Sequence, residues 1–396
     1  MGKKLLVAQS GGPTSAINAT LAGIIEAAIR NPEVSDVLGA RYGIQGVLRE
    51  QFLDLSGIEH IEDLLDTLAV TPAAALGSCR FKLKDPAQDP SEFEELIRIF
   101  QKHEIGYFVY IGGNDSMDTV WKLSDYIKEH HIPDIVVVGA PKTIDNDVVG
   151  TDHTPGFGSA AKYIAVSMQE ILRDCAVYTV PAVTIVEIMG RDAGWLTAAA
   201  ALTRGTGMEA DLICLPERAF DHDAFFARLR AALADHPNVV VAVSEGLRCP
   251  DGSYLGASTQ SGAADVFGHQ YLAGTGKALE RMIKAEIGFK VRAVELNILQ
   301  RCASHVASAV DLAESVMVGR AAVEAAAAGQ SGMMMTFRRA EEAPYRVTVE
   351  SGNIAEIANR VRTVPDAFIT ADGMQITDAC VEYLRPLILG EVDQEY

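Results

Sequence analysis

The sequence predicts an α/β protein of two lobes, each with a mainly parallel sheet, and an active-site cleft between them. The length of 396 residues corresponds to two or three domains. Near-continuous apolar strands alternate with segments of helix length, which is typical of parallel strands buried on both faces. This pattern occurs between residues 4 and about 140 and again between residues 183 and about 299, so we expect two lobes of similar build.

Polar or glycine-rich segments follow the predicted strands. The strands are expected at residues 4–8 before SGGPTS, 107–111 before GGNDS, 134–139 before PKTIDND, 183–188 before MGRDAGW, 211–215, 238–243 before SEG, and 290–299. Helices are expected over residues 15–30, from 116 to about 130, 222–235 and 304–328, with an exposed loop over 248–275. Ligands of open parallel sheets bind beyond the carboxyl ends of the strands, so these segments predict the site.

The charge balance excludes several classes of protein. Acidic residues outnumber basic ones 53 to 34, which gives a formal net charge of −19, and no block of Lys or Arg occurs. A nucleic-acid or anionic-membrane binder is normally basic, overall or on one face. No stretch approaches the roughly 20 apolar residues of a membrane span, and the first residues predict a strand rather than a signal sequence. We expect no nucleic-acid or membrane partner, and a location in the cytoplasm with the six widely spaced cysteines reduced.

Two of the turns suit phosphate binding. In SGGPTS, Gly11 and Gly12 let the backbone approach a phosphate, and the following helix N-terminus offers free N–H groups. In GGNDS, Asn114 and Asp115 offer oxygens to a Mg²⁺ that carries phosphates. A tight turn needs glycine in any case, and Asn, Asp and Ser are good helix caps. Each turn alone therefore leaves a structural and a functional interpretation open.

The segment PKTIDND, residues 141–147, carries the strongest chemical signal. One of its two carboxylates can take a hydroxyl proton and the other can hold Mg²⁺ or a sugar hydroxyl, while Lys142 can neutralise phosphate oxygens. Asp and Asn are also ordinary turn residues. The convergence of a Lys and two Asp beyond one buried strand favours function.

Further charged residues follow the strands of the second half. Arg191 can make bidentate phosphate contacts, and Glu245 can accept hydrogen bonds from sugar hydroxyls. Arg80, Arg292 and Arg301 complete a set of cations for anionic ligands, although a single Arg is more often a solvated or ion-paired side chain. The nine histidines show no zinc-ligand spacing.

Six motifs in the order SGGPTSAINA, LGSCRF, GGNDS, PKTIDND, MGRDAGW and EG resemble the phosphofructokinase family over about residues 4–325. The resemblance implies two Rossmann-like lobes and Mg²⁺-dependent transfer of a phosphoryl group to the 1-hydroxyl of fructose 6-phosphate. It implies a donor-binding lobe of residues 1–155 and about 303–340, and a sugar-phosphate-binding lobe of about 156–302. Residues 341–396 would form a C-terminal extension that packs on the lobes, and the protein would be a homodimer or homotetramer.

The resemblance also implies a role for each matching residue. Asp145 would take the proton of the 1-hydroxyl, and Thr143, Lys142 and Arg191 would stabilise the transferring group. The donor would bind at Gly12, Arg80, Asp115 and Ser116. The sugar phosphate would bind at Asp147, Met189, Gly190, Glu245, Arg292 and Arg301, where one of the two arginines can come from a neighbouring subunit. Mg²⁺ would bind at Asn114, Asp115 and Asp147.

Two positions predict the phosphoryl donor. ATP-using members resemble GGDGS and PGTIDND, whereas the pyrophosphate-dependent branch carries Asp and Lys where this chain has Asp115 and Lys142. The Asp115 carboxylate occupies the place of an α-phosphate and repels the negative charge of that group. Lys142 fills the space beside it and adds a positive charge. We therefore predict a reversible reaction with pyrophosphate. The alternatives are ATP as donor, or a non-catalytic sugar-phosphate-binding subunit, and sedoheptulose 7-phosphate is an open second acceptor.

Some positions depart from the family pattern. Asn114 replaces an Asp, and its neutral side chain weakens the expected Mg²⁺ site. Asp115 or Asp147 would then supply the charged ligand. Ile298 stands where many members have His or Tyr, and Ala182 replaces an Arg that ATP-using members lend across a subunit interface. The helix over 15–29 lacks the cations that bind an effector phosphate, so we expect no regulation there.

Overall fold

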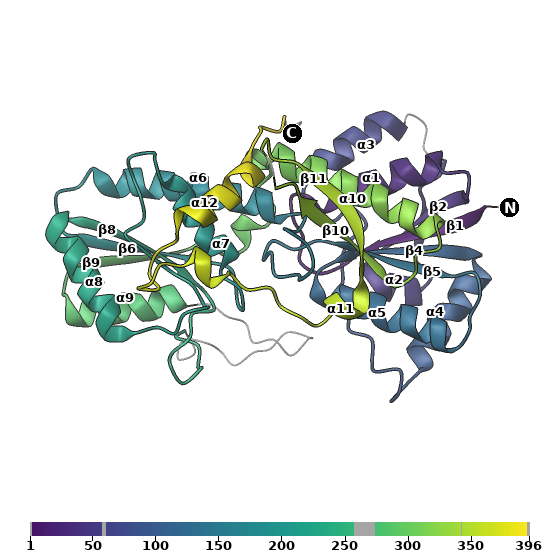
Figure 1. Ribbon diagram of the computed structural model, residues 1–396, viewed down its shortest axis with the longest axis horizontal. Coiled ribbons are helices and arrows are strands. Elements are labelled where there is room, and N and C mark those ends of the chain that lie inside the picture. Colours follow the sequence, from purple (N-terminus) through teal and green to yellow (C-terminus); the bar gives the residue numbers. More distant parts are fainter. Residues whose placement is uncertain (1, 58–60, 257–273, 342, 394–396) are drawn as a thin grey trace.

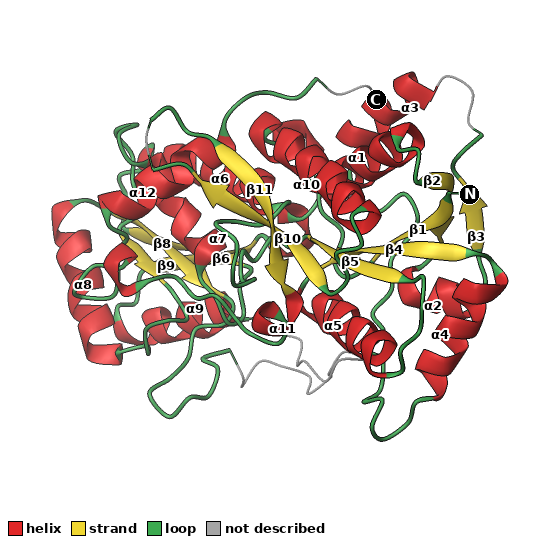
Figure 2. Ribbon diagram, turned by 45° about the vertical axis from the view of Figure 1, so that its right-hand side comes forward, coloured by secondary structure: helices red, strands yellow, loops and turns green. Residues whose placement is uncertain are grey.

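The protein consists of two lobes that lie side by side, each built around one sheet with helices on both faces (Figures 1 and 2). The computed structural model describes residues 2–57, 61–256, 274–341 and 343–393. The expected α/β fold with two mainly parallel sheets is confirmed.

The sheet of the first lobe has seven strands in the order β11-β10-β5-β4-β1-β2-β3. Their bounds are β1 Lys3–Gln9, β2 Val34–Ala40, β3 Phe52–Asp54, β4 Ile105–Gly112, β5 Val136–Pro141, β10 Met333–Arg339 and β11 Val347–Asn353. The inner strands pair in parallel, and the two edge strands β3 and β11 pair antiparallel. All eight residues of β4 are buried, which explains its unbroken apolar sequence.

Helices cover both faces of this sheet because alternate strand residues point to opposite sides. Leu5 and Val7 pack under α1 (Ile17–Arg30), α3 (Ile61–Val70) and α10 (Ala309–Ala327). Leu6 and Ala8 pack against α2 (Gly43–Leu48), α4 (Ser91–Lys102) and α5 (Asn114–Glu129). The backbones of α1 and α10 touch, since a Cβ on Gly23 would lie 2.3 Å from the carbonyl oxygen of Val316.

The second sheet has four parallel strands in the order β7-β8-β6-β9. Its bounds are β6 Ala182–Ile188, β7 Leu212–Cys214, β8 Asn238–Ser244 and β9 Lys290–Glu295. One face packs against α6 (Phe157–Ala176), α7 (Trp195–Ala198) and α12 (Asp378–Leu384). The other face packs against α8 (His222–Asp235) and α9 (Thr275–Glu286).

Two expected elements are shorter in the structure. The strand expected over 290–299 ends at Glu295, and a 3-10 turn over Asn297–Gln300 follows, which begins at the positive φ of 43° of Asn297. The helix expected from residue 304 begins at Ala309, because the Ser308 hydroxyl accepts a hydrogen bond from the Asp311 N–H and caps it. Most of the loop expected over 248–275 lies outside the described residues.

The C-terminal part of the chain joins both lobes (Figure 1). Strand β11 lies within the range expected to form an extension and is the edge strand of the first sheet. After α11 (Ile354–Ile357) the chain crosses to the second lobe, where Cys380, Val381 and Leu384 of α12 enter the core. Residues 359–362 therefore lie between the lobes. No described helix has the length and apolar character needed to cross a membrane.

Candidate active site

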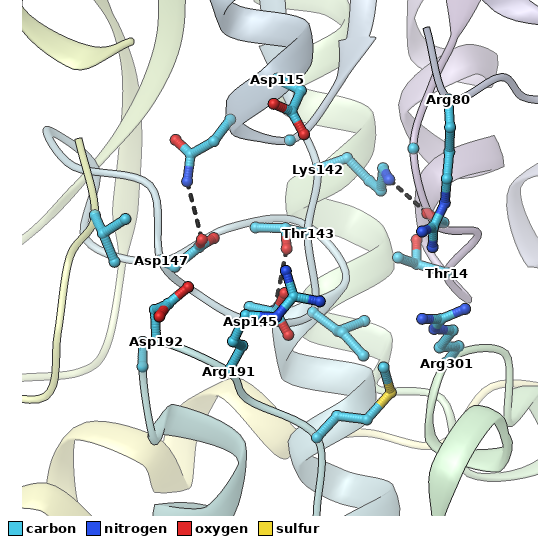
Figure 3. Close-up of a pocket in the computed structure, with 18 of the residues that line it drawn as sticks. Thr14, Arg80, Asp115, Lys142, Thr143, Asp145, Asp147, Arg191, Asp192 and Arg301 are labelled. Atoms are coloured by element: carbon cyan, nitrogen blue, oxygen red, sulfur yellow. Dashed lines mark hydrogen bonds between the residues drawn. The ribbon is translucent and has the colours of Figure 1, made fainter. Parts of the chain in front are cut away.

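A cavity of about 420 Å³ lies between the lobes, at the carboxyl ends of β1, β4, β5, β6 and β8 (Figure 3). Twelve of the residues predicted from the sequence line it: Gly12, Arg80, Asn114, Asp115, Lys142, Thr143, Asp145, Asp147, Met189, Arg191, Glu245 and Arg301. Segments separated by almost 300 residues are thus brought together, as expected for ligands at the ends of parallel strands.

The loop after β5 carries the two central carboxylates. The Lys142 N–H donates to the carbonyl of Gly112 at 2.8 Å, which ties the start of the loop to β4. The Asp145 N–H donates to the Thr143 hydroxyl oxygen at 3.1 Å. Asn146 has a φ of 54°, a left-handed conformation that Asn adopts more readily than most residues. This bend separates Asp145 from Asp147, and both line the cavity.

Lys142 is a buried cation beside the first glycine turn. Its Nζ donates to the carbonyl oxygen of Gly12 at 2.5 Å and lies 3.3 Å from where a Cβ of Gly11 would be. Burial lowers the pKa of Lys142 to about 8, against the opposing attraction of Asp145. The side chain is therefore mainly protonated at neutral pH, and it fills the space next to the turn.

Asp145 lies where the cations of the site converge. Burial raises the pKa of the Asp145 carboxyl, while Arg301, Arg191 and Lys142 act in the opposite direction. Figure 3 shows the Arg191 guanidinium close to Asp145, and Arg301 and Lys142 on one side of it. A carboxylate with a raised pKa is a better general base than an ordinary Asp, because its proton affinity lies nearer neutral pH.

Asp147 and Asn114 form a pair on the opposite side of the cavity. The Asn114 Nδ2 donates to Asp147 Oδ2 at 2.9 Å, and burial together with Asp145 raises the pKa of Asp147 to about 7. The Asn114 Oδ1 is buried and has no hydrogen-bond partner. An orphaned carbonyl-type oxygen beside the carboxylates of Asp147 and Asp115 fits Mg²⁺, which takes oxygen ligands.

The number of protein ligands suits a cation that arrives with phosphate. Within the described residues, no group of three or more His, Cys, Asp or Glu side chains could hold a metal. Mg²⁺ in such sites keeps waters and substrate phosphate oxygens and takes one or two carboxylates from the protein. Asn114, Asp115 and Asp147 together satisfy that requirement.

The second lobe contributes Arg191 and Glu245. The Arg191 Nε is buried without a hydrogen-bond partner, so the guanidinium has a donor left for a ligand. Glu245 accepts a hydrogen bond from the Gly190 N–H at 3.2 Å, and burial raises its pKa to about 7. The two turns touch, since a Cβ on Gly246 would lie 1.9 Å from the carbonyl oxygen of Arg191.

Charge is distributed unevenly around the cavity. Figure 3 shows Arg80, Lys142 and Arg301 on one side, with Asp147 and Asp192 on the other. The cationic side adjoins Gly12, whose Cβ position would lie 3.9 Å from the Arg301 guanidinium carbon. The cavity therefore offers a place for anions despite the net charge of −19 on the whole chain.

Three predicted residues do not line the cavity. Ser116 is buried below the turn, where its hydroxyl donates to the Ser10 hydroxyl at 3.0 Å. Gly190 supports Glu245 from behind through its N–H. Arg292 is exposed on β9, at the edge of the second sheet, and its Nη1 lies 3.7 Å from Asp174 Oδ2. It stands three residues before the end of the strand, which places it away from the cavity of its own chain.

The cavity also contains residues that the sequence analysis did not select. They are Pro13, Thr14, Lys82, Gly113, Ile144, Asp192, Ala193, Asn359, Arg360 and Val361. Most are neighbours of selected motifs. The Thr14 hydroxyl, for example, accepts hydrogen bonds from the N–H groups of Ala16 and Ile17 at the start of α1. The segment 359–361 carried no recognisable motif, and only the crossing of the C-terminal chain brings it to the site.

Glycine turns at the ends of parallel strands, a converging set of cations and a buried carboxyl with a raised pKa fit a site for phosphoryl transfer between anionic ligands. The chain belongs to the phosphofructokinase family, whose model, described as "Phosphofructokinase", matches residues 4–326.

Full-length relatives are similar to this chain. A protein of Halomonas elongata named pyrophosphate–fructose 6-phosphate 1-phosphotransferase is 42% identical, over 97% of this chain and 91% of its own. A protein of the same name from Xanthomonas campestris is 42% identical, over 99% and 93%. The crystal structure of pyrophosphate-dependent phosphofructokinase from Nitrosospira multiformis superposes with a TM-score of 0.88 at 37% identity, covering 100% of this chain and 94% of that one.

Proposed function

We propose that the protein transfers a phosphoryl group from pyrophosphate to the 1-hydroxyl of fructose 6-phosphate, giving fructose 1,6-bisphosphate and phosphate in a reversible reaction. The observation that carries the choice of donor is the buried Lys142 ammonium, held on the Gly12 carbonyl beside the glycine turn. The names of the full-length relatives support the same donor and acceptor.

The donor follows from space and charge around this turn. The Lys142 side chain fills the volume next to Gly11 and Gly12, and Asp115 lines the cavity near it. A nucleoside triphosphate would place an α-phosphate and a nucleoside against this lysine and this carboxylate. Pyrophosphate has no such extension, and the cations Arg80 and Lys142 beside the turn can neutralise it.

The chemical step follows from the position of Asp145. The Asp145 carboxylate takes the proton of the 1-hydroxyl while the oxygen of that hydroxyl forms a bond to the phosphorus of the transferring group. The bond from this phosphorus to the bridging oxygen of pyrophosphate breaks. The electrons of that bond leave with phosphate. Arg191, with its unpartnered Nε, and Thr143 stabilise the charge on the transferring group.

Binding of the other groups is divided between the lobes. Asn114, Asp115 and Asp147 would hold Mg²⁺, which when bound screens the charge of the phosphate oxygens. Met189 and Glu245 contact the sugar, and Arg301 binds its phosphate. The first lobe thus binds the donor and the second lobe most of the acceptor, with catalysis where they meet.

We also propose that the active enzyme is a homodimer or homotetramer in which Arg292 serves a neighbouring subunit. This arginine is exposed on an edge strand and lies outside the cavity of its own chain. Its exposure on the sheet edge supports a role across an interface.

An aldolase-coupled assay tests the function directly. Purified protein is given fructose 6-phosphate and Mg²⁺, with pyrophosphate or ATP in parallel reactions. Activity with pyrophosphate and not with ATP is the expected result. Activity with ATP alone would leave the family and acceptor in place and overturn the argument from Lys142 and Asp115. Activity with neither would favour a non-catalytic sugar-phosphate-binding protein.

A further inference from the structure

A segment outside the part matched by the family model forms one wall of the active site. The match to the family model ends at residue 326, whereas Asn359, Arg360 and Val361 line the cavity. Val361 forms an antiparallel bridge with Val148, and the N–H of Arg362 donates to the carbonyl of Asp147 at 2.7 Å. The segment 359–362 is therefore bonded directly to the loop that carries Asp145 and Asp147.

Arg362 anchors this segment between the lobes. Its guanidinium carbon lies 4.3 Å from the centre of the Trp195 ring and 5.8 Å from that of Tyr383. The Trp195 Nε1 donates to the carbonyl oxygen of Arg362 at 3.0 Å, and the Arg362 Nη2 donates to the Tyr383 hydroxyl at 3.1 Å. Trp195 and Tyr383 both contribute to the core of the second lobe. Two aromatic rings and a hydrogen bond to Tyr383 thus fix the Arg362 guanidinium, and the hydrogen bond from Trp195 fixes its backbone carbonyl.

The other end of the guanidinium holds Asn146. The Arg362 Nη1 donates to Asn146 Oδ1 at 3.2 Å, and the same oxygen accepts from the Thr154 N–H at 3.1 Å. The Asn146 Nδ2 donates to the Tyr383 hydroxyl at 3.2 Å. Asn146 is fully buried and has the left-handed φ of 54°. Its side chain is therefore held on every side, and Arg362 supplies the charged donor.

The position of Asn146 in the chain gives this contact its consequence. Asn146 stands between Asp145 and Asp147, so its backbone bend sets the directions of both carboxylates. Arg362 does not line the cavity and does not reach the ligands itself. If the Arg362 guanidinium is removed, fewer contacts hold Asn146 in its left-handed backbone conformation. That conformation costs energy for a residue other than glycine.

We propose that Arg362 is a positioning residue, which fixes Asn146 and thereby the mutual placement of the base Asp145 and the metal-site carboxylate Asp147. The inference rests on the proposed function for the roles of these two carboxylates. Misplacement of catalytic groups by about 1 Å costs on the order of 100-fold in rate, so a loosened loop should slow the chemical step.

The test compares two substitutions of Arg362 with a matched control. Arg362→Met keeps a long side chain between the two rings and loses both hydrogen bonds. Arg362→Lys keeps the charge and one donor. Arg218→Met removes a half-buried arginine that pairs with Asp366 of the same C-terminal part at 2.9 Å and does not line the active-site cavity. All variants are assayed well below their measured unfolding temperatures.

We expect Arg362→Met to lower kcat by roughly 10- to 100-fold, with KM for fructose 6-phosphate changed less than about 3-fold. Arg362→Lys should recover about half or more of the loss on a logarithmic scale, and Arg218→Met should keep kcat within about 2-fold. A kcat of Arg362→Met within about 2-fold of wild type would overturn the proposal, as would an equal loss in Arg218→Met.

A double-mutant cycle with Asn146→Ala identifies the route. If Arg362 acts through Asn146, Arg362→Met has little further effect on kcat in the Asn146→Ala background. Independent, multiplicative effects would overturn the proposed route. The kcat values of the variants are compared with whichever donor the wild-type enzyme accepts. If the wild type is inactive with pyrophosphate, the proposed donor is refuted, and the cycle still tests whether Arg362 positions Asn146.

Discussion

Asp145→Asn isolates the proposed proton acceptor with almost no change in shape. The substitution keeps the hydrogen bond from the Asp145 N–H to Thr143, because that bond uses the backbone. It removes the basic oxygen and one negative charge from a site where Arg301, Arg191 and Lys142 surround the carboxylate. The three cations remain to bind phosphate groups, so ground-state binding should persist.

The expected loss in kcat is about 10³- to 10⁴-fold. General-base catalysis contributes about 10²- to 10⁴-fold, and we expect the upper part of the range because Arg301, Arg191 and Lys142 all act on this carboxylate. At about 1.36 kcal/mol for each factor of ten, this corresponds to roughly 4–5.5 kcal/mol of transition-state stabilisation. KM for fructose 6-phosphate should change by less than about 3-fold.

The assay needs a suitable pH and a matched control. Asp145 raises the pKa of Lys142, so its loss lowers that pKa further below about 8, and measurement at pH 6.5 keeps the lysine charged. Asp192→Asn is the control, since Asp192 lines the same cavity but pairs with Arg248 at 2.8 Å at its rim. A kcat of Asp145→Asn within about 10-fold of wild type, or an equal loss in Asp192→Asn, would refute Asp145 as the base.

Three further predictions concern pH, donor and packing. The pH profile of kcat/KM should rise through about 7 as Asp147 and Glu245 lose protons and fall above about 8 as Lys142 loses its charge; a flat profile from 6 to 9 would contradict this. Asp115→Gly should lower activity with pyrophosphate and gain little with ATP, because Lys142 still fills the site; efficient use of ATP by this variant in parallel assays would show that Lys142 does not block it. Gly23→Ala should destabilise the protein by about 1–3 kcal/mol in urea unfolding, although Ala favours helix, because its Cβ would lie 2.3 Å from a carbonyl oxygen of α10; unchanged stability would refute that close packing.

The strands and the site motifs could be predicted because both depend on local sequence. Apolar runs such as 107–111 mark strands buried on both faces, and the polar segments after them fall at one end of a parallel sheet by geometry alone. The motif PKTIDND therefore identified Lys142, Asp145 and Asp147 correctly as residues that line the cavity.

The remaining parts depend on contacts between distant segments. The family resemblance implies that Arg292 binds the sugar phosphate, whereas the structure places it three residues before the end of β9, exposed on the edge strand of the second sheet. Ser116 follows a glycine turn and yet is buried under it by the bond to Ser10. The proposed role of Arg362 depends on Trp195, which lies 167 residues away in the sequence, and on Tyr383, which lies 21 residues away. They meet Arg362 only because the C-terminal chain crosses between the lobes.

The central claim is that this site takes its phosphoryl group from pyrophosphate. The most direct measurement is ³¹P NMR of one mixture that contains the protein, Mg²⁺, fructose 6-phosphate and equal amounts of pyrophosphate and ATP. The account predicts that the pyrophosphate signal falls while fructose 1,6-bisphosphate and phosphate appear in equal amounts and ATP stays constant. A fall of ATP with the appearance of ADP, while pyrophosphate stays constant, would contradict it.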